Sequence, residues 1–229
     1  MRSRWQGVPP AAPIERTRVI SKAPRWRALD RSPWEPGGDE VAIAALLDLV
    51  EEAAPDVAAH MERTARLARL VALEARLSDP LHRLVIRTAR LHDLGKLAIP
   101  PWVREKPGPL SDTERRIMRS HPVTGQSILE RKAGLAGLGV LVRATHERWD
   151  GTGYPDRLKG SSIPIPSRIV TVCDAFDAMT KPRPYRPSMT IDAALEELDR
   201  CAGAQFDPGI VKVFCELFQN RFDRLAVGA

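Results

Sequence analysis

The sequence predicts an all-α protein, a helical bundle preceded by an extended, irregular N-terminal arm, and three observations support this prediction. From Asp39 onward the chain is dominated by Ala, Leu, Arg and Glu, which are good helix formers. No segment alternates apolar and polar residues as a half-buried strand does. Aromatic residues make up only 5% of the chain, which is low for an aromatic-rich β architecture. Without an internal repeat, a bundle is the expected arrangement.

One predicted helix opens at Pro55-Asp56 and carries a histidine on its apolar face. Residues at helical spacing define that face, namely His60, Thr64, Leu67 and Val71. We therefore expect His60 to point inward. The next helix follows a break at Ser78-Asp79-Pro80, and its inward face ends at His92. Gly95 is expected to stop this helix.

The later helices are predicted from their start signals and apolar spacing. Ser111 is followed three positions later by Glu114, which is the capping-box pattern of a helix start. Further helices are expected over residues 122–131, 135–146, 167–180, 190–202 and 208–220. An irregular loop is expected over residues 149–166.

Length and charge divide the chain into two parts. A chain of 229 residues accommodates one well-buried domain with a tail. Residues 1–38 contain six prolines, three tryptophans and eight Lys or Arg against three acids, so we expect a basic arm or linker there. The remainder, residues 39–229, has 27 basic against 26 acidic residues and forms the predicted domain. Its mixed charges argue against a nucleic-acid polymer as partner.

Composition also excludes several classes of protein. No stretch approaches the roughly 18 uncharged apolar residues that cross a membrane, so membrane insertion is not expected. The N-terminal residues lack the continuous apolar core of a secretory signal. Three cysteines without a CxxC pair argue against a disulfide framework and against a thiolate zinc site. The expected location is the cytoplasm.

The histidines supply the candidate chemistry. His82 lies about 80° off the inward stripe of its predicted helix, so we expect it to have a surface or structural role. The other four are His60, His92, His121 and His146, and Asp93 directly follows His92. Histidine and carboxylate donors without cysteine favour iron, manganese or zinc. The side chains of an adjacent His-Asp pair diverge, so the carboxylate can bridge to a second metal, and paired metals favour phosphodiester hydrolysis.

These residues also resemble a known family. The string HDLGK at residues 92–96, with His60 before it and His121-Pro122 after it, resembles the HD superfamily of metal-dependent phosphohydrolases. Four later strings closely resemble its HD-GYP subfamily: HERWDGTGYP at 146–155, IP at 163–164, DAFDAMT at 174–180 and RPYR at 183–186. The resemblance spans about residues 56–220.

The resemblance implies an HD-type helical domain that hydrolyses cyclic di-GMP to pGpG, onward to GMP, or both. The nucleophile would be a metal-activated hydroxide, and the cofactors would be two or three divalent ions, iron or manganese. By motif matching, one metal would be held by His60, His92, Asp93 and Asp174. Its neighbour would be held by Asp93, His121 and His146, so Asp93 would be the bridging catalytic residue.

The same resemblance assigns residues to the substrate and to a partner. Lys96 matches a lysine that contacts the substrate phosphate, and an ammonium there can also assist the leaving oxygen. Arg183 and Arg186 match residues that hold the flanking phosphates, as guanidinium groups do well. Tyr185 would stack, hydrogen bond or pack. The loop Gly153-Tyr154-Pro155 resembles a docking element for diguanylate cyclase domains.

Two positions depart from the subfamily pattern. Thr145 stands where most members have a histidine before His146, and a hydroxyl is a weaker metal ligand than imidazole. Asp56 stands where members with three metals have a glutamate. Two other functions therefore stay open: an HD phosphohydrolase that acts on another nucleotide or phosphoester, and a weakly active or inactive signalling and binding module.

Overall fold

The computed structural model describes residues 38–181 and 187–227, with side chains up to residue 219. Within these ranges it is helical without a β-strand, as predicted. The α-helices are α1 Gly38–Ala53, α2 Pro55–Glu74, α3 Asp79–Leu91, α4 Pro101–Arg104, α5 Asp112–Met118, α6 His121–Glu130, α7 Ala136–Arg143, α8 Ile165–Thr180, α9 Ile191–Arg200 and α10 Pro208–Val227. Three 3-10 helices lie between them: η2 Leu94–Ala98, η3 Ala144–His146 and η4 Gly160–Ser162. The predicted arm lies largely outside the described residues.

Local signals in the sequence set several helix starts. Helix α2 begins at Pro55 and α3 at Asp79, each with proline in its first turn. At α5, the side chain of Glu114 accepts the backbone N–H of Ser111 at 2.6 Å, and Ser111 Oγ accepts the N–H of Glu114 at 3.3 Å. The predicted capping box is confirmed. The loop predicted over 149–166 is interrupted by η4 and ends sooner, because α8 begins at Ile165.

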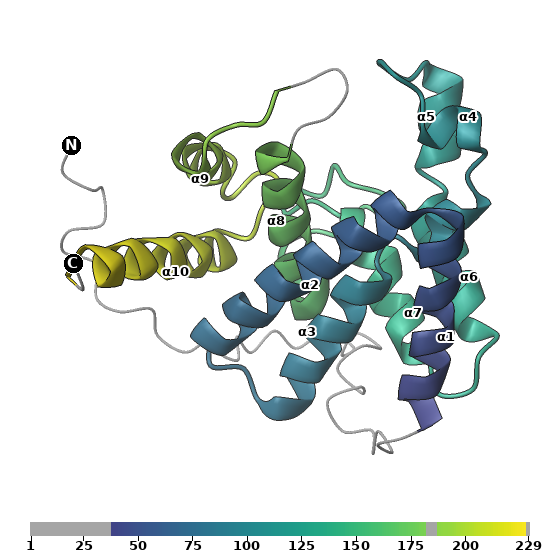
Figure 1. Ribbon diagram of the computed structural model, residues 1–229, viewed down its shortest axis with the longest axis horizontal. Helices are drawn as coiled ribbons and strands as arrows, with labels where there is room; N and C mark the ends of the chain where they lie inside the picture. Colours follow the sequence, from purple (N-terminus) through teal and green to yellow (C-terminus); the bar gives the residue numbers. More distant parts are fainter. Residues whose placement is uncertain (1–37, 182–186, 228–229) are drawn as a thin grey trace.

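The helices pack around two apolar clusters that share α2 and α3. In Figure 1 these two helices lie in the middle of the molecule, with α10 on one side and α1 on the other. One cluster joins these two helices to α8, α9 and α10, and Phe214 is its largest fully buried side chain. The other joins them to α1, η2, α6 and α7 through residues such as Met61 and Leu141. Because different residues of α2 and α3 belong to the two clusters, each of these helices packs against both groups of helices.

Gly95 has a different role from the helix stop that the sequence predicted. Helix α3 already ends at Leu91, and Gly95 lies inside η2 without a positive φ angle. A Cβ atom at this position would lie 1.9 Å from the carbonyl oxygen of His121 and 2.6 Å from the backbone nitrogen of Gly125. Glycine is required here because the backbones of η2 and α6 touch. This contact brings the residues after α3 close to the start of α6.

Among the described helices, none combines the length and the apolar character that a membrane crossing requires.

Replacing Gly95 with Ala tests the close backbone contact. The added methyl group collides with backbone atoms that cannot rotate away, so we expect Gly95→Ala to lower the free energy of unfolding by at least about 2 kcal/mol. Gly209→Ala is the matched control, since its nearest neighbour, a side-chain oxygen of Asp207, is 3.3 Å away. Urea denaturation measures both variants. Equal stability of the two would contradict the packing role of Gly95.

Candidate metal centre

The structure brings the predicted histidines and acids together from five separate elements. His60 lies on α2, and His92 and Asp93 directly follow α3. His121 is the first residue of α6, and His146 is the last residue of η3. Two groups have ligand atoms that all lie within 4.8 Å of one another and could hold a metal ion: His60, His92 and Asp93 in one, and Asp93, His121 and His146 in the other. We call these cluster 1 and cluster 2.

Cluster 1 is arranged around one oxygen of Asp93. Oδ2 of this carboxylate lies 3.4 Å from Nε2 of His92 and 3.7 Å from Nε2 of His60. The carboxylate of Asp174, on α8, lies beside this cluster, with Oδ1 at 3.0 Å from Nε2 of His60. All four side chains of the first predicted metal site therefore meet.

Cluster 2 uses the other oxygen of the same carboxylate. Oδ1 of Asp93 lies 3.3 Å from Nε2 of His121. The Nε2 atoms of His121 and His146 are 2.8 Å apart, with the rings edge to face. Asp93 therefore turns one oxygen to each cluster, which is the arrangement that a bridging carboxylate requires.

Hydrogen bonds on the far side of three imidazoles fix which nitrogen faces the clusters. Nδ1 of His92 lies 2.8 Å from the carbonyl oxygen of Ala89, and Nδ1 of His121 lies 2.8 Å from that of Met118. A carbonyl oxygen only accepts, so these Nδ1 atoms donate, and the neutral rings present an Nε2 lone pair to the clusters. Nδ1 of His60 is 2.7 Å from Oδ2 of Asp177. Outer partners of this kind orient metal-binding histidines in proteins.

The charges of the clusters follow from burial and from mutual attraction. Burial disfavours the carboxylate of Asp93, but His92, Lys96 and His121 outweigh burial and hold its pKa well below the usual range. Burial lowers the pKa of His92, and burial together with His121 lowers the pKa of His146 to about 3. For His60, burial is outweighed by bonds to carboxylates, which raise its pKa to about 9.

Two buried atoms support the fit of a metal. Nε2 of His92 and Oδ1 of Asp93 are both buried and make no hydrogen bond among the described residues. Leaving such atoms unpaired costs about 1–3 kcal/mol each, and more for a charged group. A divalent cation in each cluster would satisfy these atoms, and the charge of the cation in cluster 1 would replace the proton on His60. The donor set of imidazoles and carboxylates fits such an ion.

The remaining predicted site residues differ in where they lie relative to the clusters. Nζ of Lys96 lies 2.5 Å from Oδ2 of Asp93, so the ammonium adjoins the clusters. Asp56 is exposed and belongs to neither cluster. Thr145 is buried and donates its hydroxyl hydrogen to the carbonyl oxygen of Val142 at 2.8 Å. The three other substrate residues predicted from the resemblance lie outside the described residues: Arg183, Tyr185 and Arg186.

The loop after η3 is shaped by a carboxylate that the sequence analysis did not single out. Glu147 is buried, and its two oxygens accept the backbone N–H groups of Asp156 at 2.7 Å and Leu158 at 3.0 Å. Gly153 packs so closely against the backbone of Glu147 that a Cβ atom would lie 2.6 Å from its Cα. The ring of Tyr154 is thereby stacked on His146, with centroids 5.3 Å apart.

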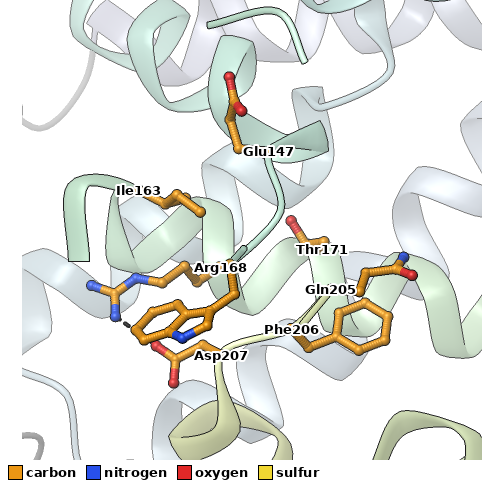
Figure 2. Close-up of a pocket in the computed structure, with 8 residues that line it drawn as sticks. Glu147, Ile163, Arg168, Thr171, Gln205, Phe206 and Asp207 are labelled. Carbon is orange, nitrogen blue, oxygen red and sulfur yellow. Dashed lines mark hydrogen bonds and ion pairs between the residues drawn. The ribbon is translucent and has the colours of Figure 1, made fainter. Parts of the chain in front are cut away.

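The base of the same loop is tied to the connection between α9 and α10. The backbone N–H groups of Trp149 and Asp150 donate to the carbonyl oxygens of Gln205 and Ala204, at 3.1 and 2.8 Å. Figure 2 shows the ion pair beneath it, in which Nη1 of Arg168 lies 2.6 Å from Oδ2 of Asp207. Only about 10 Å³ of space is left between these side chains, so this region supports the loop and has no room for a ligand.

A larger space opens beside the clusters. Its volume is about 300 Å³, at the lower end of the range for small-molecule sites. His146 and Asp174 form part of its wall, as do Tyr154 and the two basic residues Arg119 and Arg148. A phosphate-containing molecule in this cavity would lie directly against the candidate metal ligands.

Comparison with known proteins agrees with this geometry. A family profile described as HD domain matches residues 44–210, well over half of the chain. The chain belongs to the HD domain family. The histidine and aspartate pair that gives such domains their name is His92-Asp93 here.

Relatives of this HD domain are known as phosphodiesterases. It is 40% identical over 171 residues to the cyclic di-GMP phosphodiesterase response regulator RpfG of Xanthomonas campestris, covering 74% of this chain and 45% of RpfG. It is 36% identical over 169 residues to the 3'3'-cGAMP-specific phosphodiesterase 3 of Vibrio cholerae, covering 74% and 37%. The chain thus spans less than half the length of these curated relatives.

Solved structures share the fold of this HD domain. An HDG"Y"P protein from Bdellovibrio bacteriovorus superposes with a TM-score of 0.60 at 17% identity, over 71% of this chain and 52% of the other. A cyclic GMP-AMP specific phosphodiesterase of V. cholerae gives 0.56 at 23% identity, over 78% and 47%. The predicted resemblance to HD-GYP phosphodiesterases and the predicted helical fold class are confirmed.

Asp177 is a second residue of this HD domain that the sequence analysis left without a role. Its carboxylate accepts from Nε and Nη2 of Arg63, at 2.8 and 2.9 Å, while it also contacts Nδ1 of His60. These bonds hold the imidazole of His60 toward cluster 1. The available signal was its position one helical turn after Asp174 on α8, which places both acids on the same helix face.

Replacing Glu147 with Gln tests how the loop is held. The amide NH₂ of the glutamine would point at the backbone N–H of either Asp156 or Leu158. Both groups are donors, so one of the two buried hydrogen bonds is lost and the two N–H groups repel each other. We expect Glu147→Gln to lower the free energy of unfolding by about 2 kcal/mol and to speed amide exchange at residues 156–158. Glu105→Gln, at an exposed ion pair, should change stability by less than about 0.5 kcal/mol. Unchanged exchange in Glu147→Gln would refute the anchoring role.

Proposed function

We propose that this HD domain is a metal-dependent phosphodiesterase that hydrolyses cyclic di-GMP to pGpG, GMP or both. The observation that carries the proposal is the pair of clusters that share Asp93, in which His92 Nε2 and Asp93 Oδ1 are buried and make no hydrogen bond among the described residues. The identity to phosphodiesterases of cyclic dinucleotides supports the substrate class.

The proposed metals are two divalent ions, iron or manganese. His60, His92, Asp93 and Asp174 would hold one ion, and Asp93, His121 and His146 would hold the other. Imidazole and carboxylate donors without thiolate favour these metals. Two such ions supply Lewis-acid activation of a phosphoryl oxygen and of a water molecule near neutral pH. A third ion has less support, since Asp56 is exposed and outside both clusters.

The chain's own residues bind and orient the phosphate. The ammonium of Lys96 is about a quarter exposed, so it reaches the open side of the site and can donate to a phosphate oxygen or to the leaving oxygen. Asp177 keeps His60 oriented, and Glu147 keeps the loop that carries Tyr154 against His146. Arg183 and Arg186 would hold the flanking phosphates, with Tyr185 beside them; these three roles rest on the resemblance alone.

A second candidate substrate is 3'3'-cGAMP. The chain is 36% and 38% identical to two V. cholerae phosphodiesterases that are specific for it, which is close to its identity to the cyclic di-GMP enzymes. The metals would act on phosphate and not on base, so the same centre would serve either molecule. One observation favours a weakly active module. The hydroxyl of Thr145 donates its hydrogen bond to the carbonyl oxygen of Val142.

A partner protein is also part of the proposal. A diguanylate cyclase domain would contact the loop that carries Gly153-Tyr154-Pro155. Tyr154 itself packs against His146, so the surface free for such a contact is the outer part of the loop, residues 156–162, which is mostly exposed.

Turnover of cyclic di-GMP tests the function. Protein loaded with Mn²⁺ or Fe²⁺ should convert cyclic di-GMP to pGpG or GMP, measured by liquid chromatography. Asp93→Asn should lower the rate by more than about 100-fold and reduce bound metal, because even outer partners of a metal site contribute about 10- to 100-fold. Asp48→Asn makes the same charge change on the exposed side of α1 and should retain the rate.

The outcomes separate the candidate functions. Faster turnover of 3'3'-cGAMP than of cyclic di-GMP would support the second substrate. Turnover of other phosphoesters alone, or binding of cyclic di-GMP without product, would overturn the proposal. Full activity of Asp93→Asn at normal metal content would rule out the bridging role.

Metal affinity tests the role of Asp177. Asp177→Asn retains one acceptor oxygen but loses the charge and the second acceptor, so His60 is held less firmly toward cluster 1. We expect the affinity for Mn²⁺, measured by competition with a chelator, to fall about 10- to 100-fold. Thermal unfolding of the metal-free variant separates this effect from a general loss of stability. Affinity equal to that of the unmodified protein would show that Asp177 does not position His60.

A further inference from the structure

An arginine at the end of α5 faces the 300 Å³ cavity beside the clusters. Arg119 lies among the residues that line the cavity, together with Tyr154, Asp174 and Gln205. Its backbone N–H donates to the carbonyl oxygen of Arg115 at 2.9 Å, so the end of the helix holds its main chain in place. Its side chain is exposed. A ligand that enters the cavity from solvent therefore meets this side chain.

The guanidinium of Arg119 has no ion-pair partner among the residues that the structure describes. Its Cζ lies over the ring of Tyr154, 5.1 Å from the centroid. Within the described ranges no carboxylate lies at ion-pair distance from it. The other arginine of the cavity differs, because Nη2 of Arg148 lies 2.9 Å from Oδ2 of Asp150. Arg119 is thus the side chain of the two that has its charge available for an anion.

Tyr154 links this charge to cluster 2 through two ring contacts. Its ring is parallel to that of His146, within 2°, at a centroid distance of 5.3 Å. His146 belongs to cluster 2, so the ring of Tyr154 contacts both the guanidinium and a candidate metal ligand. A cyclic dinucleotide has two phosphates on opposite sides of one ring. When one phosphate is at the clusters, the other must lie at some distance across the cavity.

We propose that Arg119 contributes to binding the phosphate that is not being hydrolysed, beside the arginines assigned from the resemblance, and that this contact favours cyclic dinucleotides over simple phosphodiesters. The inference rests on the proposed function and extends it to a substrate-binding residue outside the known motifs. A guanidinium donates two parallel N–H bonds to a phosphate, and contact with an aromatic ring leaves its donors free. Phosphate is favoured over a stacked base because the ring of Tyr154 is already in contact with His146 and Arg119.

The test compares two substrates in the metal-loaded protein. Cyclic di-GMP has a second phosphate, whereas bis(p-nitrophenyl) phosphate has only the phosphate that reacts. In Arg119→Met we expect the ratio of kcat/KM for cyclic di-GMP to kcat/KM for the small diester to fall about tenfold, mainly through KM. Arg119→Lys should recover part of the loss. Arg116→Met, which removes the same charge from an exposed position on α5 that does not line the cavity, should leave the ratio unchanged.

Other results would overturn the inference. An unchanged ratio in Arg119→Met would show that the second phosphate does not contact Arg119. A fall in the ratio with cyclic di-GMP but not with cyclic di-AMP would mean that Arg119 contacts the guanine base. If the unmodified protein hydrolyses neither substrate, the proposed function is wrong, and calorimetric titration with cyclic di-GMP tests Arg119 separately. Weaker binding by Arg119→Met would then support its role, and equal binding or no binding would refute it.

Discussion

The carboxylate of Asp93, buried among imidazoles, is the interaction on which the rest of this structure depends. Asp93 is about 1% exposed. Burial of a carboxylate lowers stability unless cationic groups surround it. Nζ of Lys96 lies 2.5 Å from Asp93, and imidazoles of three separate elements lie within 3.7 Å of it. The helices must therefore be placed so that these groups arrive together.

Backbone contact and outer hydrogen bonds provide this placement. At Gly95 the backbone of η2 contacts the backbone of α6. This contact places the neighbouring residues Asp93 and Lys96 close to His121. The carbonyl oxygens at the ends of α3 and α5 then orient His92 and His121, and Asp177 orients His60. The geometry of the site is thus set largely by main-chain atoms, which move less than side chains do. Rigid support of this kind is what a binding site for two cations requires.

The sequence alone predicted the features that depend on residues close together in the chain. The starts of α2, α3 and α5 follow from proline and from a capping box, and the inward face of His60 follows from helical spacing. The meeting of the ligands came from resemblance to a family, since spacing in the chain does not bring distant helices together. The roles of Asp177 and Glu147 were not predicted. Asp177 acts on a residue 117 positions away, and Glu147 acts on backbone groups, which leave no pattern of residue types.

The way in which Glu147 holds its loop has an evolutionary consequence. The partners of its carboxylate are main-chain N–H groups, which every residue except proline possesses. The exposed side chain at Lys159 can therefore be exchanged without altering the path of the chain beneath it. In such an arrangement the outer surface of the loop can diversify at little cost to the candidate metal ligands, so these two parts of the domain can change independently.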